Sequence, residues 1–184
     1  VTCDRYDGIP GWEVADLTKD PRFPDAPDAP RQLAALQLPP GGGDGFGARV
    51  RGLLHPPQNG DYVFMITADD QAQLFLSDGP DPARKQLVAQ AREWLNPLEF
   101  DRFPEQRSAP VTLATDHEYY LEILFKENAG NDHCTVGWTL PDGTVETPLR
   151  GDHLSPLALT SAQKEFARRK DAFLLEIKTA AGDT

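Results

Sequence analysis

Residues 60–70 read GDYVFMITADD, and this stretch decides the fold. Successive side chains of a β-strand point to opposite faces. Tyr62 and Phe64 therefore share one face, and Val63 and Met65 lie on the other. The pattern predicts a β-strand that ends in two consecutive aspartates, Asp69 and Asp70.

The same alternation recurs along the rest of the chain, with turn-forming sequences between the runs. The alternating runs are 74–76, 119–126 and 134–140, and the turn-forming stretches are 58–61, 128–132 and 141–143. Many short strands at this spacing, without intervening helices, indicate an all-β fold. We therefore expect an antiparallel β-sandwich with a jelly-roll-like arrangement.

The two ends of the chain carry different signals. Residues 1–48 are rich in proline and glycine, which predicts a wrapping segment with one short helical turn at 31–38 and a plain loop at 41–47. Thr160 and Gln163 have the spacing of a capping box and precede an amphipathic stretch, which predicts a C-terminal helix. The expected domains are thus a sandwich over residues 1–157 and a helix with linker over residues 158–184.

Composition narrows the classes of function. The chain has 184 residues and a formal net charge of −11, which suits one domain and argues against nucleic acid and anionic membrane surfaces as partners. No apolar run approaches the ~18 residues that a membrane span requires, so we expect no membrane insertion.

No catalytic motif is recognisable, and we expect the chain not to be an enzyme. It lacks a Gly-x-Ser-x-Gly elbow and a His-Glu-x-x-His sequence, and nothing selects a catalytic pair among its 29 acidic residues. The two cysteines, Cys3 and Cys134, fit neither a zinc pattern nor a redox pair. A disulfide between them and two buried free thiols both remain open.

Several stretches of the sequence, in their order along the chain, resemble the PA-fourteen domain family. This family is the β-sandwich module named after the anthrax protective-antigen fragment. The matching stretches are 9–17, 60–76, 104–108, 119–132, 136–143 and 151–156. The resemblance covers residues 5–157 and implies the same sandwich fold.

The resemblance also implies a metal site. In the lectin-like members of the family, two adjacent aspartates joined by a cis peptide chelate Ca²⁺, a second loop completes the site, and sugar hydroxyls bind the ion directly. Carried over to this sequence, the adjacent pair is Asp69 and Asp70. Both carboxylates reach one ion only if the backbone departs from extended geometry, because neighbours in a strand point to opposite faces.

The second loop of the family corresponds to residues 128–132. The resemblance implies that Asp132 binds the ion through its carboxylate and Asn131 through its amide oxygen. It also implies that the main-chain carbonyls of Asn128 and Gly130 contribute. Ca²⁺ takes 6–8 oxygen ligands, which suits such a mixture of donors.

Three further residues are expected to contact a bound glycan beside the three aspartates. Trp94 offers an aromatic face to a sugar ring, and its alternative roles are to pack in the core or to anchor its own loop. His133 offers ring nitrogens, and its alternative role is that of an exposed histidine at a strand end. Gln71 directly follows the aspartate pair, where the family commonly has glycine. Trp138, on an alternating strand, is expected in the core.

We therefore expect a Ca²⁺-dependent glycan-binding module, with a glycan or small saccharide as its partner. The chain begins at Val1 and its one methionine is Met65, so it is expected to be a segment of a larger polypeptide with further domains. The expected location is extracellular, at the cell surface or periplasmic. Two alternatives are a structural or assembly module without sugar binding, and an accessory domain of a glycoside hydrolase.

Overall fold

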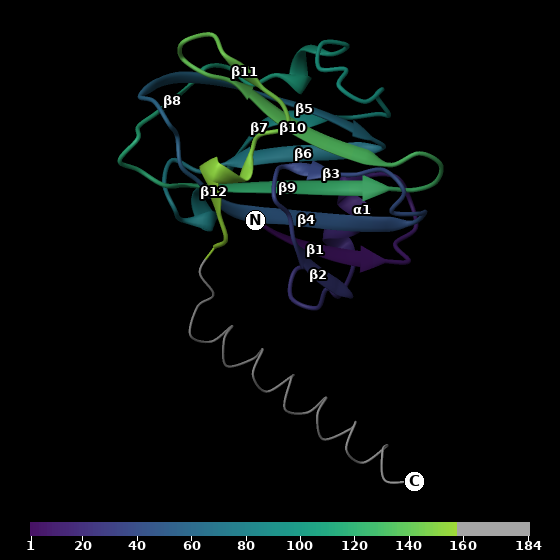
Figure 1. Cartoon of the computed structure of the whole chain (residues 1–184). Helices are drawn as coiled ribbons and strands as arrows, with labels where there is room; N and C mark the ends of the chain where they lie inside the picture. Colours follow the sequence, from purple (N-terminus) through teal and green to yellow (C-terminus); the bar gives the residue numbers. More distant parts are fainter. Residues whose placement is uncertain (158–184) are drawn as a thin grey trace, which may run out of the picture.

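Two antiparallel sheets pack face to face in the computed structural model, which describes residues 1–157 (Figure 1). The seven-stranded sheet has the order β2-β1-β4-β9-β6-β7, with β12 pairing β4. The five-stranded sheet has the order β11-β10-β5-β8, with β3 pairing β10. The predicted all-β sandwich is confirmed.

The elements of the chain have the following bounds. The strands of the larger sheet are β1 (Thr2–Asp7), β2 (Ala29–Gln32), β4 (Phe46–Leu54), β6 (Gln71–Leu76), β7 (Gln86–Ala91), β9 (Tyr119–Glu127) and β12 (Leu154–Ser155). Those of the smaller sheet are β3 (Gln37–Leu38), β5 (Gly60–Asp69), β8 (Val111–Leu113), β10 (His133–Thr139) and β11 (Val145–Glu146). The helical segments are α1 (Val14–Lys19) and the 3₁₀ turns η1 (Pro82–Arg84), η2 (Pro104–Gln106) and η3 (Gly151–His153).

The main core lies between the two sheets, where the alternating apolar residues of facing strands meet. Phe64 and Ile66 of β5 and Ile123 and Phe125 of β9 are almost fully buried there. Trp138 of β10 is also fully buried, as the sequence predicts. The alternation that identifies these strands therefore also orients them, because it assigns one face of each to the core.

A second apolar cluster covers the outer face of the larger sheet. Val14 and Leu17 of α1 pack with Tyr6, Ile9 and Leu124, and all five are buried. All nine residues of β9 are buried, because this strand has the sandwich core on one side and the N-terminal segment on the other. The prediction that the proline-rich N-terminal part wraps the sandwich is confirmed for this segment.

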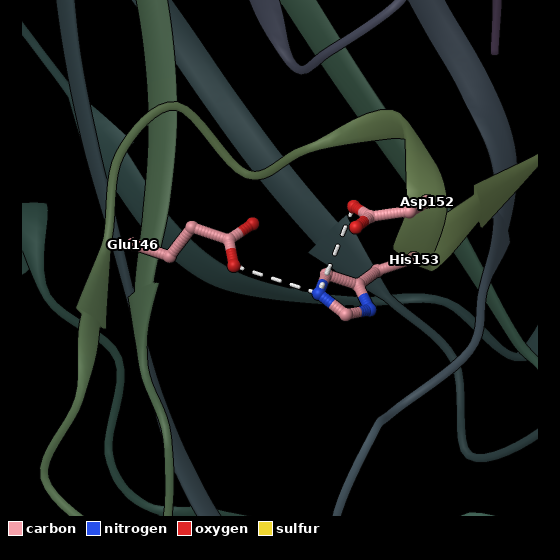
Figure 2. Close-up of side chains that lie close together, drawn as sticks. All are labelled: Glu146, Asp152 and His153. Carbon is pink, nitrogen blue, oxygen red and sulfur yellow. Dashed lines mark ion pairs between the residues drawn. The ribbon is translucent and has the colours of Figure 1, made fainter.

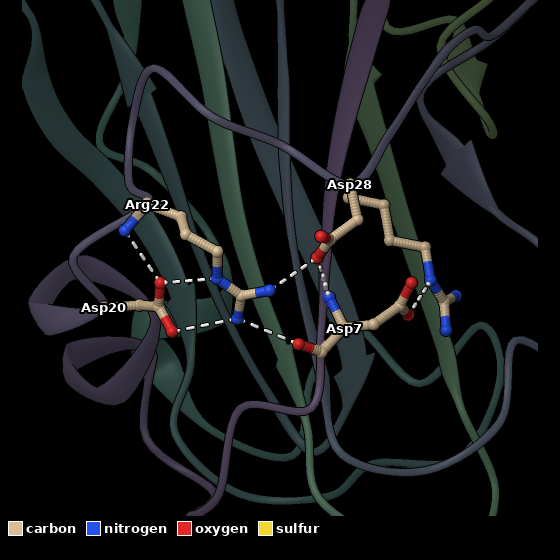
Figure 3. A network of polar contacts seen from close by, with 5 residues as sticks. Asp7, Asp20, Arg22 and Asp28 are labelled. Atoms are coloured by element: carbon tan, nitrogen blue, oxygen red, sulfur yellow. Dashed lines mark hydrogen bonds and ion pairs between the residues drawn. The ribbon is translucent and has the colours of Figure 1, made fainter. Parts of the chain in front are cut away.

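A polar network holds the N-terminal segment in place (Figure 3). Arg22 donates to Asp20 Oδ1 and Asp28 Oδ2 at 2.9 and 2.7 Å, and to the carbonyl of Asp7 at 2.9 Å. The main-chain N–H of Asp7 donates to Asp28 Oδ2 at 2.8 Å. One guanidinium thus connects the end of β1 to both ends of the chain segment that follows α1.

Parts of the N-terminal prediction are wrong. The expected helical turn at residues 31–38 is instead divided between the edge strands β2 and β3. Arg31 pairs with Cys3 in one sheet and Leu38 pairs with Cys134 in the other, so long-range strand pairing overrides the local helical pattern. The short helix α1 and the strand β1 were not anticipated.

Three further points follow from residues 1–157. Cys3 and Cys134 are buried free thiols of the core between the sheets, and burial raises the pKa of Cys134. No helix in this part of the chain is long and apolar enough to cross a membrane. The predicted helix that begins at Thr160, like the whole expected segment 158–184, lies outside the described residues.

Candidate metal site and adjacent cavity

The adjacent aspartates lie at one end of the sandwich, where β5 passes directly into β6. The peptide bond between Asp69 and Asp70 is cis, as the resemblance implies. His133 pairs with Asp69 in the ladder between β5 and β10, so the start of β10 lies beside the aspartate pair. The chain thereby places the loop before β10, residues 128–132, at the same edge.

Hydrogen bonds connect this loop to the aspartate pair and to a third segment, the loop 39–45. The main-chain N–H of Asn128 donates to Asp70 Oδ2 at 2.9 Å, and that of Gly130 donates to Asp44 Oδ1 at 3.1 Å. The N–H of Gly41 donates to Asp132 Oδ1. Three segments that are far apart in the sequence therefore meet around Asp70 and Asp132.

The carboxylates at this edge are desolvated and repel one another. Burial raises the pKa of Asp69, and the charges of Asp70 and Asp132 raise it further. Asp132 is buried, and its Oδ2 has no hydrogen-bond partner within residues 1–157. Buried acceptors without partners are costly unless a cation or donor meets them, so these side chains fit a hard cation such as Ca²⁺.

A fourth acidic residue, Glu127, lies at this edge and was missed by the sequence analysis. It is the last residue of β9, its side chain is fully buried, and neither carboxyl oxygen has a partner among the described residues. Burial raises the pKa of Glu127 to about 8, with further contributions from Asp70, Asp69 and Asp132. Its position in the inward-facing series of β9 is the signal that could have identified it.

A cavity of about 510 Å³ opens beside the carboxylates. Its polar side includes Asp69, Asn131, Asp132 and His133. Its apolar side includes Trp94, Leu98, Leu38 and Pro40. The cavity therefore joins an acidic edge to an apolar wall, which is the arrangement of a pocket for a small polar ligand with an apolar face.

Trp94 and Leu98 form the exposed part of the apolar wall. Trp94 is 52% exposed and Leu98 is 61% exposed, which is unusual for side chains of this size. Their loop is anchored to β5, because the N–H of Leu95 donates to the carbonyl of Ala68 and Thr67 Oγ1 donates to the carbonyl of Asn96, at 2.9 and 3.0 Å. The loop is thus fixed while the indole stays accessible.

The structure brings most of the predicted residues together but gives two of them other contacts. Gln71 does not line the cavity: its Oε1 accepts from the N–H of Val14 at 3.3 Å and its Nε2 donates to the carbonyl of Arg92 at 2.7 Å. The carbonyl of Asn128 accepts from the N–H of Gly45 at 2.8 Å. Gly130 is exposed in the same loop.

His133 lies in the cavity wall and is only 8% exposed, which differs from the exposed histidine of the alternative interpretation. Burial lowers its pKa, partly opposed by the charge of Asp132. Neither ring nitrogen has a hydrogen-bond partner within residues 1–157. Both nitrogens are also shielded from solvent, so the ring contributes a buried polar surface to the cavity wall.

A separate group of metal-ligating side chains lies at the junction of β11 and η3, where His153 Nε2 is 3.5 Å from Glu146 Oε2 and 3.8 Å from Asp152 Oδ1 (Figure 2). Arg150 supplies the counter-charge: its guanidinium is 3.6 Å from Glu146 Oε1 and 3.3 Å from Asp152 Oδ2. The carboxylates are already paired, so this group is an ion-pair cluster that fastens η3 to β11. Arg150 and Asp152 thus also pair with each other around Gly151.

Two packed antiparallel sheets with converging carboxylates and a cavity at one end define a β-sandwich domain with a ligand pocket at its loop edge. A family model described as the PA14 domain matches residues 35–151, and the chain belongs to this family. The matched range contains the aspartate pair, the loop 128–132 and the cavity wall around Trp94.

Several known proteins are similar to this chain. A mouse N-acetyl-β-glucosaminyl-glycoprotein 4-β-N-acetylgalactosaminyltransferase 1 is 35% identical over 133 residues, which are 70% of this chain and 13% of that protein. The solved PA14 sugar-binding domain of an RTX adhesin has a TM-score of 0.62 at 16% identity and covers 84% of this chain and 97% of that one. The epithelial adhesin 6 A domain from Candida glabrata, solved with Galβ1-3GlcNAc, has a TM-score of 0.61 at 13% identity and covers 88% of each chain. The transferase match is a small part of a much longer protein, and the structural matches show the fold.

Proposed function

We propose that this domain is a Ca²⁺-dependent carbohydrate-binding module of a larger extracellular or cell-surface protein. The observation that carries the proposal is that Asp69 and Asp132, with Asp70 beside them, lie at the edge of a cavity whose other wall includes Trp94. The sugar-binding names of the structural neighbours and the small share of the transferase that the chain matches support it.

The carboxylates of Asp69, Asp70 and Asp132 would hold the ion, with the amide oxygen of Asn131 as a further donor. When bound, Ca²⁺ supplies coordination positions that sugar hydroxyls can occupy in place of water. The chain's own residues hold the ion and orient the sugar. The aspartates would fix the cation at one side of the cavity, and its charge would offset the burial and the repulsion that raise the pKa of Asp69.

Trp94 and His133 would orient the saccharide. The exposed indole offers an apolar surface to the C–H face of a pyranose ring, and the fixed loop limits the entropy lost on binding. His133 lines the same cavity, and a small shift of its ring would let one of its nitrogens, now shielded from solvent, hydrogen-bond a sugar hydroxyl. The cavity would thus contact a sugar on two sides. The acidic edge would contact its hydroxyls, and the apolar wall would contact its C–H face.

Calorimetric titration with Ca²⁺, followed by a panel of saccharides in the presence and absence of chelator, tests the proposal. We expect Ca²⁺ binding in the wild type, sugar binding only with Ca²⁺, and loss of both in Asp69→Asn and Asp70→Asn. Asp116→Asn is the matched control, because Asp116 is exposed before β9, at the opposite end of the strand from the site. Ca²⁺ binding without any sugar binding would instead identify a structural module.

A further inference from the structure

The inward-facing series of two neighbouring chain segments, β9 and the residues that lead into β10, change from apolar to acidic at the same edge of the sandwich. In β9 the inward series runs from Ile123 through Phe125 to Glu127, and successive members differ by two residues. In the other sheet, Cys134 of β10 faces the core, and Asp132 lies two positions before it. Glu127 is therefore directed into the layer between the sheets, on the same side as Asp132.

The strand register places Glu127 beside the aspartate pair. Gln71 of β6 and Lys126 of β9 form the last pair of an antiparallel ladder, so Asp70 and Glu127 are the next residues beyond it on the two strands. The N–H of Asn128, the residue after Glu127, donates to Asp70 Oδ2 at 2.9 Å and keeps the two chain segments together at this point.

No basic side chain of the described residues pairs with Glu127. Lys126 is its sequence neighbour, but Lys126 Nζ donates to the main-chain carbonyl of Glu127 and the side chain is directed to the outer face of the sheet. The guanidinium of Arg5 lies near Gly42 but is engaged elsewhere. Its Cζ is 3.7 Å from the centroid of the Phe46 ring, and it donates to Asp7 Oδ1 and to the carbonyl of Gly42. A fully buried carboxylate without a partner is costly, and either protonation or a bound cation relieves this cost.

We propose that Glu127 is a fourth carboxylate of the cation site and holds the ion from the side of the sandwich core. This inference rests on the proposed Ca²⁺ binding and adds to it a residue that neither the aspartate pair nor the second loop contains. Asp69 is the last residue of β5, Asp70 follows it, and Asp132 lies in the loop that precedes β10. Glu127 approaches the ion from a strand whose nine residues are all buried, so it gives the site a rigid base. Both the number of charged ligands and the rigidity of a site raise its affinity for Ca²⁺.

The test compares Glu127→Gln with the wild type by calorimetric Ca²⁺ titration and by thermal unfolding with and without Ca²⁺. Glutamine keeps the volume of the side chain and removes its charge. We expect Ca²⁺ affinity to fall about 10-fold or more, and the stabilisation by Ca²⁺ to shrink accordingly. Without Ca²⁺, the variant should be at least as stable as the wild type, because glutamine replaces a buried acid beside three further acids with a permanently neutral side chain. A residue with a merely structural role would not produce this opposite pair of effects.

Glu118→Gln is the matched control, since Glu118 is exposed just before β9, at the far end from Glu127. Glu127→Asp keeps the charge but shortens the side chain, and should give an intermediate affinity, which also tests the proposal should the glutamine variant fail to fold. Wild-type affinity in both Glu127 variants would overturn the role of Glu127 and leave the proposed function standing. Absence of Ca²⁺ binding in the wild type would overturn both.

Discussion

The main-chain N–H of Asn128 donates to Asp70 Oδ2 at 2.9 Å and so links the loop after β9 to the start of β6. Asn128 is exposed, so this bond is the main protection of its amide proton. In Ca²⁺-free buffer, Asp70→Ala should speed hydrogen exchange at Asn128 about 10-fold or more, because a hydrogen bond to a charged acceptor is lost. Asp70→Asn keeps an acceptor oxygen and should change the rate much less. Equal exchange in the alanine variant and the wild type would show that the bond does not hold the loop in solution.

Trp94 gives a prediction that separates sugar binding from cation binding. Trp94→Ala should weaken saccharide binding about 10-fold, since stacking of an aromatic ring contributes on the order of 1 kcal/mol beyond area burial. Ca²⁺ affinity should stay at the wild-type value, because the indole lies on the wall away from the carboxylates. Trp12→Ala is the matched control: Trp12 is 50% exposed, close to the 52% of Trp94, but does not line the cavity. Equal losses of saccharide affinity in the two variants would remove Trp94 from the site.

Gly42 tests whether the loop 39–45 supports the cation site. A Cβ atom at Gly42 would lie 2.7 Å from Asp132 Oδ2 and 3.0 Å from both Arg5 Nη1 and Phe46 Cζ, so the Asp132 carboxylate must move. Gly42→Ala should therefore weaken Ca²⁺ binding about 10-fold, the usual effect of disturbing a residue that positions a metal ligand. Gly79→Ala is the control, because nothing lies within 4 Å of a Cβ there. Calorimetric titration of both variants makes the comparison, and unchanged affinity in Gly42→Ala would contradict the prediction.

The strands that carry the site were predictable because the alternation of apolar side chains that identifies them lies within each strand's own sequence. The alternation around Phe64 identifies β5, and the resemblance identifies Asp69 and Asp70 as the residues that end it. Glu127 was predictable in principle, since it continues the inward series of Phe125. It was missed because an acid at an inward position is normally taken as the end of a buried strand. Only the three-dimensional structure shows that its carboxyl oxygens are buried and have no hydrogen-bond partner within residues 1–157.

Other parts of the cavity have no local signal. Leu38 and Pro40 reach the wall because β3 pairs with β10, almost 100 residues later in the chain, at Cys134. The local sequence around residues 31–38 favours a helical turn, and only that distant partner makes the segment extended. The burial of His133 has the same origin, since the cavity around it is built from four separate segments.

Glu122 predicts a stability effect that is independent of the ligand site. Its buried carboxylate is 2.7 Å from Arg49 Nη2, accepts from Tyr120 Oη at 2.5 Å and pairs with Lys85. Burial alone would raise the pKa of Glu122, but Arg49, Lys85 and Tyr120 together lower it below its ordinary value of 4.5. Because the folded pKa is the lower one, this carboxylate stabilises the fold above pH 4.5 and the contribution is lost as pH falls below it. Glu122→Gln should lower the free energy of unfolding at pH 7 by about 3 kcal/mol, since Arg49 stays buried without its partner. Urea unfolding between pH 3 and 7, with Glu118→Gln as control, should show this difference narrowing toward acid pH, and a difference that is constant over the range would contradict the assigned charge of Glu122.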